Sequence, residues 1–292
     1  MTSLFVRQLT TLDFSYLCPE RGLVGETWLV DVVLSGVLNQ QGMVFDFGYV
    51  KRQIKAVLDT LADHRLLVPV ENKNITVNSD SGRISAQLVT EKIGVVVCKA
   101  PEEAVLLVNQ PLINPENLTA FLEKKVMEIL PDNVEKIEIS LYPEAITGAF
   151  YHYSHGLKKH EGNCQRIAHG HRSALNVFVD GKDDNKLAQY WADTWKDIYI
   201  ASEEDLQATM SYQGIICYQL GYQAPQGNFQ LLISADRCCL FDTDTTVELI
   251  AEHIAGVLSQ KNPGKRITVQ AFEGVNKGAI AERQESSVGF SS

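Results

Sequence analysis

The chain has 292 residues, 45% of them hydrophobic, and a formal net charge of −10. This length and apolar content indicate a folded protein of two domains or one large one, and the negative charge argues against a broad nucleic-acid surface, because phosphate contacts need clustered Lys and Arg. The longest apolar runs, such as 93–98 and 104–108, are far shorter than the roughly 20 residues of a membrane helix, so we expect no membrane segment.

The N-terminal segment, 1–7, leads directly into alternating strand sequence and lacks a secretory signal pattern, which predicts a cytoplasmic protein. Apolar periodicity and turn residues then predict the elements of the first half. In chain order these are a strand over Gly25–Gly36, a helix over Phe47–Leu61, a β-rich stretch over 74–107, a helix over Leu118–Leu130 with its start marked by Asn114 and Pro115, and a strand over Lys136–Leu141.

The second half repeats this order, and a duplication matters because it determines the fold. Its elements are a strand over Gly170–Gly181 with the glycine spacing of Gly25–Gly36, a helix over Lys186–Ile200, a β-rich stretch over 212–241, a helix over Leu249–Leu258 and a strand over 266–272. We therefore predict an α+β fold in two tandem copies, 1–145 and 146–281, each an antiparallel sheet with helices on one face, and a disordered tail over 282–292. Gly148–His155 fits either the last strand of the first copy or the first strand of the second.

Histidines are concentrated at the start of the second copy. Five of the seven lie within twenty residues: His152, His155, His160, His169 and His171. In His169-Gly170-His171 the two imidazoles point to one face of a strand, and a third histidine would complete a His₃ set, which leaves one position open on a catalytic zinc ion. We favour His155 as that third ligand, with His152 as its competitor, and we expect His160 to face solvent. The six cysteines contain no CxxC pair, so a thiolate zinc site is not indicated.

These residues resemble the tunnelling-fold family of 6-pyruvoyltetrahydropterin synthase and the 6-carboxytetrahydropterin synthase of queuosine biosynthesis. The resemblance is carried by four separate elements. They are His155 with Cys164 and His169-Gly170-His171, the segment Gly42–Gly48 containing Asp46-Phe47, the pair Asp63-His64, and Glu273 at the end of the last predicted strand.

The resemblance implies a zinc-dependent lyase that converts 7,8-dihydroneopterin triphosphate to 6-carboxy-5,6,7,8-tetrahydropterin, with loss of acetaldehyde and triphosphate. Zn²⁺ would be held by the three histidines, and the pterin would be the small-molecule partner. The resemblance further implies that Cys164 is the general base and that Asp63 orients His64 as a proton relay. Glu273 is expected to bind the amino group and ring N–H of the pterin.

The parts of this expected site are divided between the copies. The first copy keeps Asp63 and His64, but it has Cys18, Val24 and Glu26 where the family has zinc ligands. The second copy keeps the histidines, the cysteine and the glutamate, but it has no Asp-His pair near 198–202. We therefore expect one complete site per chain, assembled from both copies.

Tunnelling folds close their sheets into barrels from several copies, so the resemblance also implies a homodimer or larger homo-oligomer. Three other functions stay open: 6-pyruvoyltetrahydropterin synthase activity, a non-catalytic pterin- or zinc-binding protein of the same fold, and a different zinc-dependent hydrolase or lyase. The complementary losses favour an enzyme, because random decay would not be expected to leave a single copy of every part.

Overall fold

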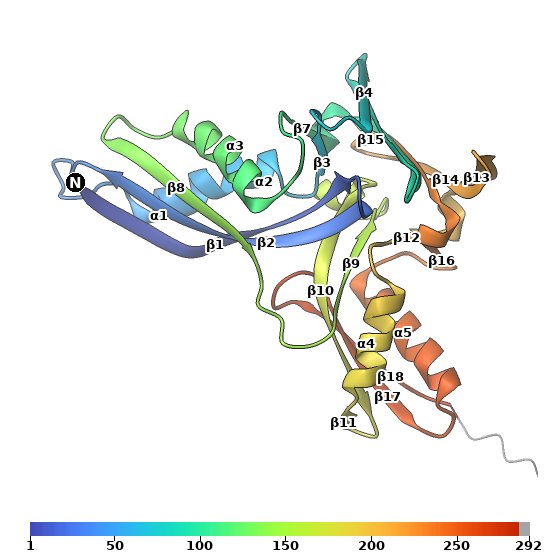
Figure 1. Cartoon of the computed structure of the whole chain (residues 1–292). Helices are drawn as coiled ribbons and strands as arrows, with labels where there is room; N and C mark the ends of the chain where they lie inside the picture. The colour runs from blue at the N-terminus through green and yellow to red at the C-terminus, as the bar shows by residue number, and fades with distance from the viewer. Residues whose placement is uncertain (286–292) are drawn as a thin grey trace, which may run out of the picture.

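The computed structural model describes residues 1–285 and contains the same arrangement twice (Figure 1). The strands of the first copy are β1 (Thr2–Cys18), β2 (Gly22–Gly36), β3 (Leu66–Pro69), β4 (Ile75–Asp80), β5 (Arg83–Thr90), β6 (Gly94–Pro101), β7 (Val105–Val108) and β8 (Val134–Pro143). Its helical segments are α1 (Phe47–Tyr49), a π-helical turn (Val50–Ile54), α2 (Lys55–Leu61), a 3-10 turn (Glu102–Ala104) and α3 (Pro115–Met127).

The second copy begins with β9, which settles the placement of the strand near Gly148. Its strands are β9 (Phe150–His155), β10 (His169–Val179), β11 (Lys182–Asp183), β12 (Ile198–Ser202), β13 (Leu206–Tyr212), β14 (Ile215–Ala224), β15 (Gly227–Ser234), β16 (Cys238–Phe241), β17 (Arg266–Phe272) and β18 (Gly278–Gln284). Its helical segments are α4 (Asn185–Thr194), α5 (Val247–Lys261) and 3-10 turns at Gly162–Gln165, Glu203–Asp205 and Ala235–Arg237.

Two predictions assigned strand residues to another kind of segment. The helix expected over Lys186–Ile200 ends at Thr194, because the aromatic and β-branched residues from Ile198 form β12 and pair in parallel with β9. The expected tail starts too early, because β18 extends to Gln284 and pairs along its whole length with β17. The rest of that tail, 286–292, lies outside the described residues.

The main sheets of the two copies have the same strand order, β7-β3-β1-β2-β8 and β16-β12-β9-β10-β17, with β18 added beside β17. The hairpin strands are antiparallel as predicted, but β3 and β7, like β12 and β16, add parallel pairs that the sequence did not reveal. The parallel pairs of β3 with β1 and of β12 with β9 are possible because the chain crosses over through a helix before β3 and β12. Before β7 and β16 the crossover is the β-rich stretch of each copy.

The β-rich stretches of the two copies join in a third sheet, with order β13-β14-β15-β6-β5-β4. Strand β15 of the second copy pairs with β6 of the first, for example Leu231 with Cys98. One core cluster accordingly contains buried residues from both copies, among them Leu17 and Tyr199. The copies are therefore joined by a shared sheet and a shared core.

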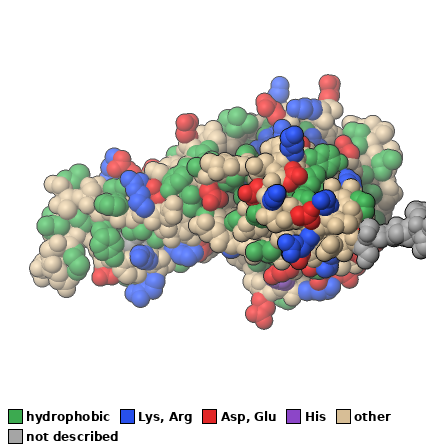
Figure 2. All heavy atoms as spheres, turned by 90° about the horizontal axis from the view of Figure 1, so that it is seen from below, with side chains coloured by type: hydrophobic (Ala, Val, Ile, Leu, Met, Phe, Trp, Pro, Cys, Tyr) green, Lys and Arg blue, Asp and Glu red, His purple; other side chains and the backbone are tan. Residues whose placement is uncertain are grey.

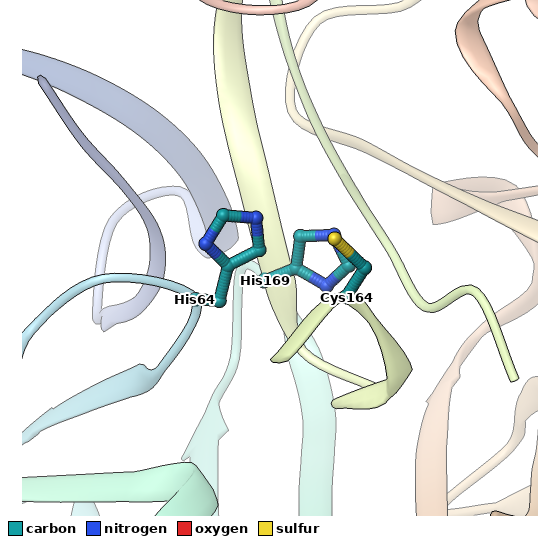
Figure 3. A group of neighbouring side chains, drawn as sticks. All are labelled: His64, Cys164 and His169. Carbon is teal, nitrogen blue, oxygen red and sulfur yellow. The ribbon is translucent and has the colours of Figure 1, made fainter. Parts of the chain in front are cut away.

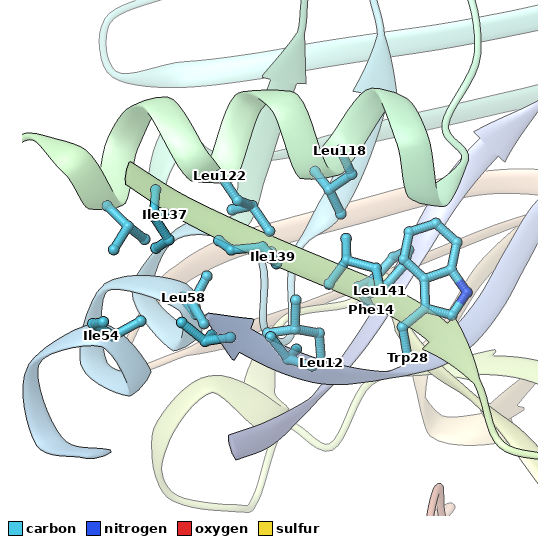
Figure 4. Packing of buried hydrophobic residues seen from close by; sticks show 14 of the residues in the cluster. Leu12, Phe14, Trp28, Ile54, Leu58, Leu118, Leu122, Ile137, Ile139 and Leu141 are labelled. Atoms are coloured by element: carbon cyan, nitrogen blue, oxygen red, sulfur yellow. The ribbon is translucent and has the colours of Figure 1, made fainter. Parts of the chain in front are cut away.

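Helices cover one face of the first sheet because their apolar residues recur every three to four positions. Leu118 and Leu122 of α3 are fully buried and lie over the sheet, as does Leu58 of α2 (Figure 4). Burying each such side chain contributes roughly 1.5–3 kcal/mol. Asn114 caps α3 by accepting a hydrogen bond from the N–H of Asn117, as predicted from the sequence.

The two main sheets cross where β1 and β2 meet β9 and β10. Ser15 Oγ lies 2.7 Å from Ser154 Oγ, and these serines occupy equivalent positions, since Ser15 pairs with Gly25 and Ser154 with Gly170. A Cβ on Gly25 would lie 1.8 Å from the carbonyl oxygen of Tyr153, and one on Gly170 would lie 2.6 Å from the Cα of Gly25. Only glycine permits this close approach between the two copies.

No helix among the described residues is long and apolar enough to cross a membrane. On the face shown in Figure 2, basic and acidic side chains are interspersed and do not form a basic band.

Candidate functional site

Three of the predicted metal ligands meet at the crossing of the sheets. His155 of β9 pairs directly with His169 of β10, and His171 follows two residues later on the same face. Potential ligand atoms of the three side chains lie within 4.8 Å of one another, and all three residues are buried. His152 lies elsewhere, because its Nδ1 is 2.7 Å from the carbonyl oxygen of Gly25.

The ring nitrogens of these histidines fit a metal ion. The Nδ1 of His155 donates to the carbonyl oxygen of Thr245, and the Nδ1 of His169 donates to that of Arg166, each over 2.9 Å. These bonds fix the tautomer that leaves Nε2 free. Within residues 1–285, His155 Nε2 and both ring nitrogens of His171 are buried without a hydrogen-bond partner. Burial holds the pKa of His155 and His169 well below the usual range, so both are neutral, as metal ligands must be.

The Asp63-His64 pair of the first copy lies beside these residues. His64 Nδ1 is 2.7 Å from Asp63 Oδ2, and the His64 ring centroid is 4.9 Å from that of His169. Ligand atoms of His64, Cys164 and His169 lie within 4.8 Å of one another, and the side chains approach one another in Figure 3. Burial lowers the pKa of His64, but hydrogen bonds to Asp63 and Cys164 outweigh it and raise this pKa to about 10.

His64 occupies a left-handed backbone conformation with φ of 53°. This region is costly for a residue with a side chain, so it persists only where surrounding contacts hold it. The N–H of His64 donates to the carbonyl oxygen of Asp13 over 2.6 Å, which fixes the turn before β3. The strained turn therefore aims the imidazole at the second copy.

Glu273 closes the other side of the histidine group. It follows β17, and its Oε1 is 3.9 Å from His171 Nε2. Lys277, which the sequence did not single out, has its Nζ 3.7 Å from Glu273 Oε2. The site thus contains a carboxylate and an ammonium group next to the imidazoles.

Asp13 of β1 also belongs to the site and was missed from the sequence. It is 3% exposed, with Oδ1 3.3 Å from His171 Nδ1. Burial raises its pKa, but His171, Lys277 and Thr27 outweigh burial and hold the pKa well below the usual range. The available signal was one charged residue in the apolar strand segment Leu12-Asp13-Phe14.

The equivalent positions of the first copy form a second, altered site. Strand register places Tyr16 at the position of His155, Val24 at that of His169 and Glu26 at that of His171. The expectation that Cys18 stands at the first ligand position was therefore wrong, because Cys18 lies two residues further along β1. Tyr16 has no imidazole to offer a metal ion.

The counterpart of His64 in this second site is Asp197, which has a similar φ of 57°. Arg21 Nε donates to Asp197 Oδ2 over 3.0 Å, a second bond joins Arg21 Nη2 to Oδ1, and Arg21 Nη1 donates to Tyr16 Oη over 3.3 Å. An internal ion pair thus fills the position where the first site has its catalytic candidates.

The fold and the site together define a duplicated tunnelling-fold protein with one histidine-rich site at the junction of the copies. The family model for 6-pyruvoyl tetrahydropterin synthase matches the chain twice, over residues 18–152 and 145–284. The chain belongs to the 6-pyruvoyl tetrahydropterin synthase family and is a lyase-type enzyme, as the sequence predicted.

Individual relatives match about one copy each. A Pyrococcus horikoshii protein with the provisional name 6-carboxy-5,6,7,8-tetrahydropterin synthase is 25% identical over 133 residues, which cover 46% of this chain and 76% of that protein. A Pyrococcus abyssi protein of the same provisional name has the same identity and coverage. The crystal structure of 6-pyruvoyl tetrahydropterin synthase from Plasmodium vivax aligns with a TM-score of 0.41 and 16% identity, over 50% of this chain and 93% of that chain. The structure of 6-pyruvoyl tetrahydropterin synthase from Plasmodium falciparum aligns with a TM-score of 0.40 and 17% identity, over 48% of this chain and 90% of that chain.

Proposed function

We propose that this chain is a zinc-dependent lyase that converts 7,8-dihydroneopterin triphosphate to 6-carboxy-5,6,7,8-tetrahydropterin and releases acetaldehyde and triphosphate. Family membership and the provisional names of the Pyrococcus relatives support the reaction class and the pterin substrate. The 6-carboxy product is preferred over the 6-pyruvoyl product because those relatives carry that name.

The observation that carries the proposal is the complementary division of the site. Asp63 and His64 come from the first copy, whereas Cys164 and the three histidines come from the second, and one junction brings them together. The equivalent junction holds the Arg21–Asp197 ion pair. One working site per chain explains why each part persists in a single copy.

The proposed roles follow from the chemistry of each group. Cys164 as thiolate would accept a proton from the substrate side chain, and the adjacent His64 would return a proton, held in orientation by Asp63. The carboxylate of Glu273 would accept hydrogen bonds from the pterin amino group and ring N–H. A Zn²⁺ ion bound by the three histidines would supply Lewis-acid polarisation of the substrate oxygens.

The assembly is a further part of the proposal. Within residues 1–285, β8 pairs only with β2, so its outer edge offers free backbone groups to another chain. We expect a homodimer or larger homo-oligomer, and a monomeric mass by light scattering would contradict this expectation.

The test is turnover of 7,8-dihydroneopterin triphosphate by the purified, zinc-loaded protein. Acetaldehyde, triphosphate and the pterin product are measured together, for the wild type and for Cys164→Ala and His64→Ala. Cys18→Ala and His160→Ala serve as controls, because both residues lie outside the site and His160 is exposed. The two site variants are expected to lose at least about 100-fold in kcat, the scale of a general acid–base contribution.

The outcomes separate the competing functions. Triphosphate release without acetaldehyde, with a 6-pyruvoyl product, would favour the 6-pyruvoyl activity. No turnover by the zinc-loaded wild type would refute the proposed reaction and leave a binding protein or a different zinc enzyme. Activity that survives in His64→Ala would refute the shared site.

A further inference from the structure

Asp13 lies at the centre of the junction between the copies. It belongs to β1, where it pairs with Thr27 of β2, and its side chain is buried against the second copy. It comes from the copy that supplies no zinc-ligand candidate. Its contacts nevertheless reach both halves of the candidate site.

The first set of contacts concerns His171. The Nδ1 atoms of His155 and His169 each donate to a backbone carbonyl oxygen of their own copy. His171 differs, because within residues 1–285 its Nδ1 makes no hydrogen bond, and Asp13 Oδ1 lies 3.3 Å from it. A carboxylate this close to Nδ1 favours the tautomer with the proton on Nδ1 and leaves Nε2 as the ligand atom.

The carboxylate of Asp13 is itself held in place. Thr27 Oγ1 donates to Asp13 Oδ1 over 2.6 Å, and Lys277 Nζ lies 3.6 Å from Asp13 Oδ2. The hydroxyl fixes one oxygen by a hydrogen bond and the ammonium charge attracts the other, so the carboxylate has a defined direction. That direction is toward the ring of His171.

The second set of contacts concerns the Asp63-His64 pair. The backbone N–H of Asp13 donates to Asp63 Oδ1 over 2.9 Å. The carbonyl oxygen of Asp13 accepts from the N–H of His64 over 2.6 Å. One residue therefore touches a zinc-ligand candidate through its side chain and the proton-relay candidates through its backbone.

We propose that Asp13 is a positioning residue that orients His171 for the metal and places the Asp63-His64 pair at a fixed position relative to it. The inference rests on the zinc site of the proposed function. It adds a group from the ligand-free copy to the metal centre, so that the centre is complete only when both copies are folded together. The side chain of Asp13 orients His171, and the backbone of Asp13 holds His64 in place.

The experiment measures zinc affinity by competition with a chromophoric chelator, in the wild type, Asp13→Ala and Asp13→Asn. Loss of a group that supports a metal ligand typically costs about 10–100-fold in affinity. We expect Asp13→Ala to lose about 100-fold in zinc affinity. Asp13→Asn should lose only about 10-fold, because its amide oxygen can still accept a hydrogen bond from His171 Nδ1. The visible spectrum of the cobalt-substituted protein should change in both variants, because the ligand geometry at His171 changes.

Asp197→Asn is the matched control. Asp197 is 4% exposed and lies at the same junction, but it pairs with Arg21 in the second, altered site. It is expected to keep wild-type zinc affinity and the wild-type cobalt spectrum, even where its thermal stability falls. Zinc affinity is thereby separated from a general effect on folding.

Several results would overturn the inference. Affinities of both Asp13 variants within twofold of the wild type, with unchanged cobalt spectra, would show that Asp13 does not orient His171. Because Asn preserves the side-chain shape, Asp13→Asn provides the answer even where the alanine variant fails to fold. A wild type that binds no zinc would refute the zinc site itself, and a wild type that binds zinc without turning over the pterin would leave the Asp13 inference standing while the proposed reaction fails.

Discussion

Replacing Glu26 by Gln should stabilise this protein at alkaline pH and have little effect at acidic pH. Glu26 is 7% exposed in β2, where its Oε1 accepts a hydrogen bond from the N–H of Thr27. Burial raises the pKa of Glu26 from 4.5 to about 7, although Thr27 and the nearby Arg172 and Arg21 oppose the effect. The folded state therefore retains a proton between about pH 4.5 and 7 that the unfolded state loses.

The sign and size of the effect of Glu26→Gln on the free energy of unfolding follow from this difference in proton binding. The contribution of Glu26 to the free energy of unfolding is fully present below its unfolded pKa and is lost as the pH rises through its folded pKa. A pKa difference of about 2.5 corresponds to about 3 kcal/mol, at about 1.36 kcal/mol per pKa unit. Gln cannot ionise and keeps the acceptor for the Thr27 N–H. We expect Glu26→Gln to exceed the wild type by less than about 1 kcal/mol at pH 5 and by about 3 kcal/mol at pH 8.

The assay is urea unfolding followed by tryptophan fluorescence at pH 5, 6, 7 and 8. His152, whose pKa burial and the charge of Arg21 lower to about 4, adds stability as the pH rises and partly hides the effect of Glu26 in the wild type alone. The difference between wild type and Glu26→Gln at each pH removes the part of this contribution that does not depend on Glu26, whose Oε2 lies 3.8 Å from His152 Nδ1. A difference that stays constant from pH 5 to 8, or a wild type that is the more stable protein at pH 8, would refute the reasoning.

Three further predictions concern the junction and the metal centre. Arg21→Ala should lower the free energy of unfolding by about 3 kcal/mol, because it leaves the buried carboxylate of Asp197 unpaired. Zinc content measured by mass spectrometry should not change, and an unaltered free energy of unfolding would contradict the ion-pair argument. Gly25→Ala should fail to yield folded protein or lower the melting temperature sharply, because its Cβ would overlap backbone atoms of Tyr153 and His171 in the second copy. Gly256→Ala, in open space within α5, should instead stabilise the protein by up to about 1 kcal/mol, and equal effects of the two would refute the close approach. His155→Ala should weaken zinc binding by more than the roughly 10–100-fold that is typical for loss of a group bonded to a ligand. His152→Ala should leave zinc affinity unchanged, and a larger loss in His152→Ala than in His155→Ala would make His152 the third ligand.

Local sequence patterns were sufficient for the elements and for the repeated design. Alternation over Arg266–Phe272 predicted β17 with its correct bounds, and Asn114 with Pro115 predicted the start of α3. These signals succeed because strand alternation, capping and proline act within a few residues. The prediction that a helix reaches Ile200 was wrong because a contact distant in the chain decides the structure there. The last residues of the predicted helix form β12 because β9, which lies more than forty residues earlier, offers a strand edge.

The chemistry of the site was visible in the sequence, because histidines two apart on a strand share a face whatever the fold. The choice of His155 over His152 needed the register of β9 against β10, which side-chain pattern alone does not fix. The contact of Asp13 with His171 and the ion pair of Arg21 with Asp197 could not be predicted from the sequence for the same reason, since each joins residues that are far apart in the chain. Sequence alone thus determined which groups the protein has and that they fall into two copies. The tertiary structure decided which of them meet, because only the crossing of the two sheets at Gly25 and Gly170 brings the halves of one site together. At the equivalent junction the Arg21–Asp197 ion pair takes their place.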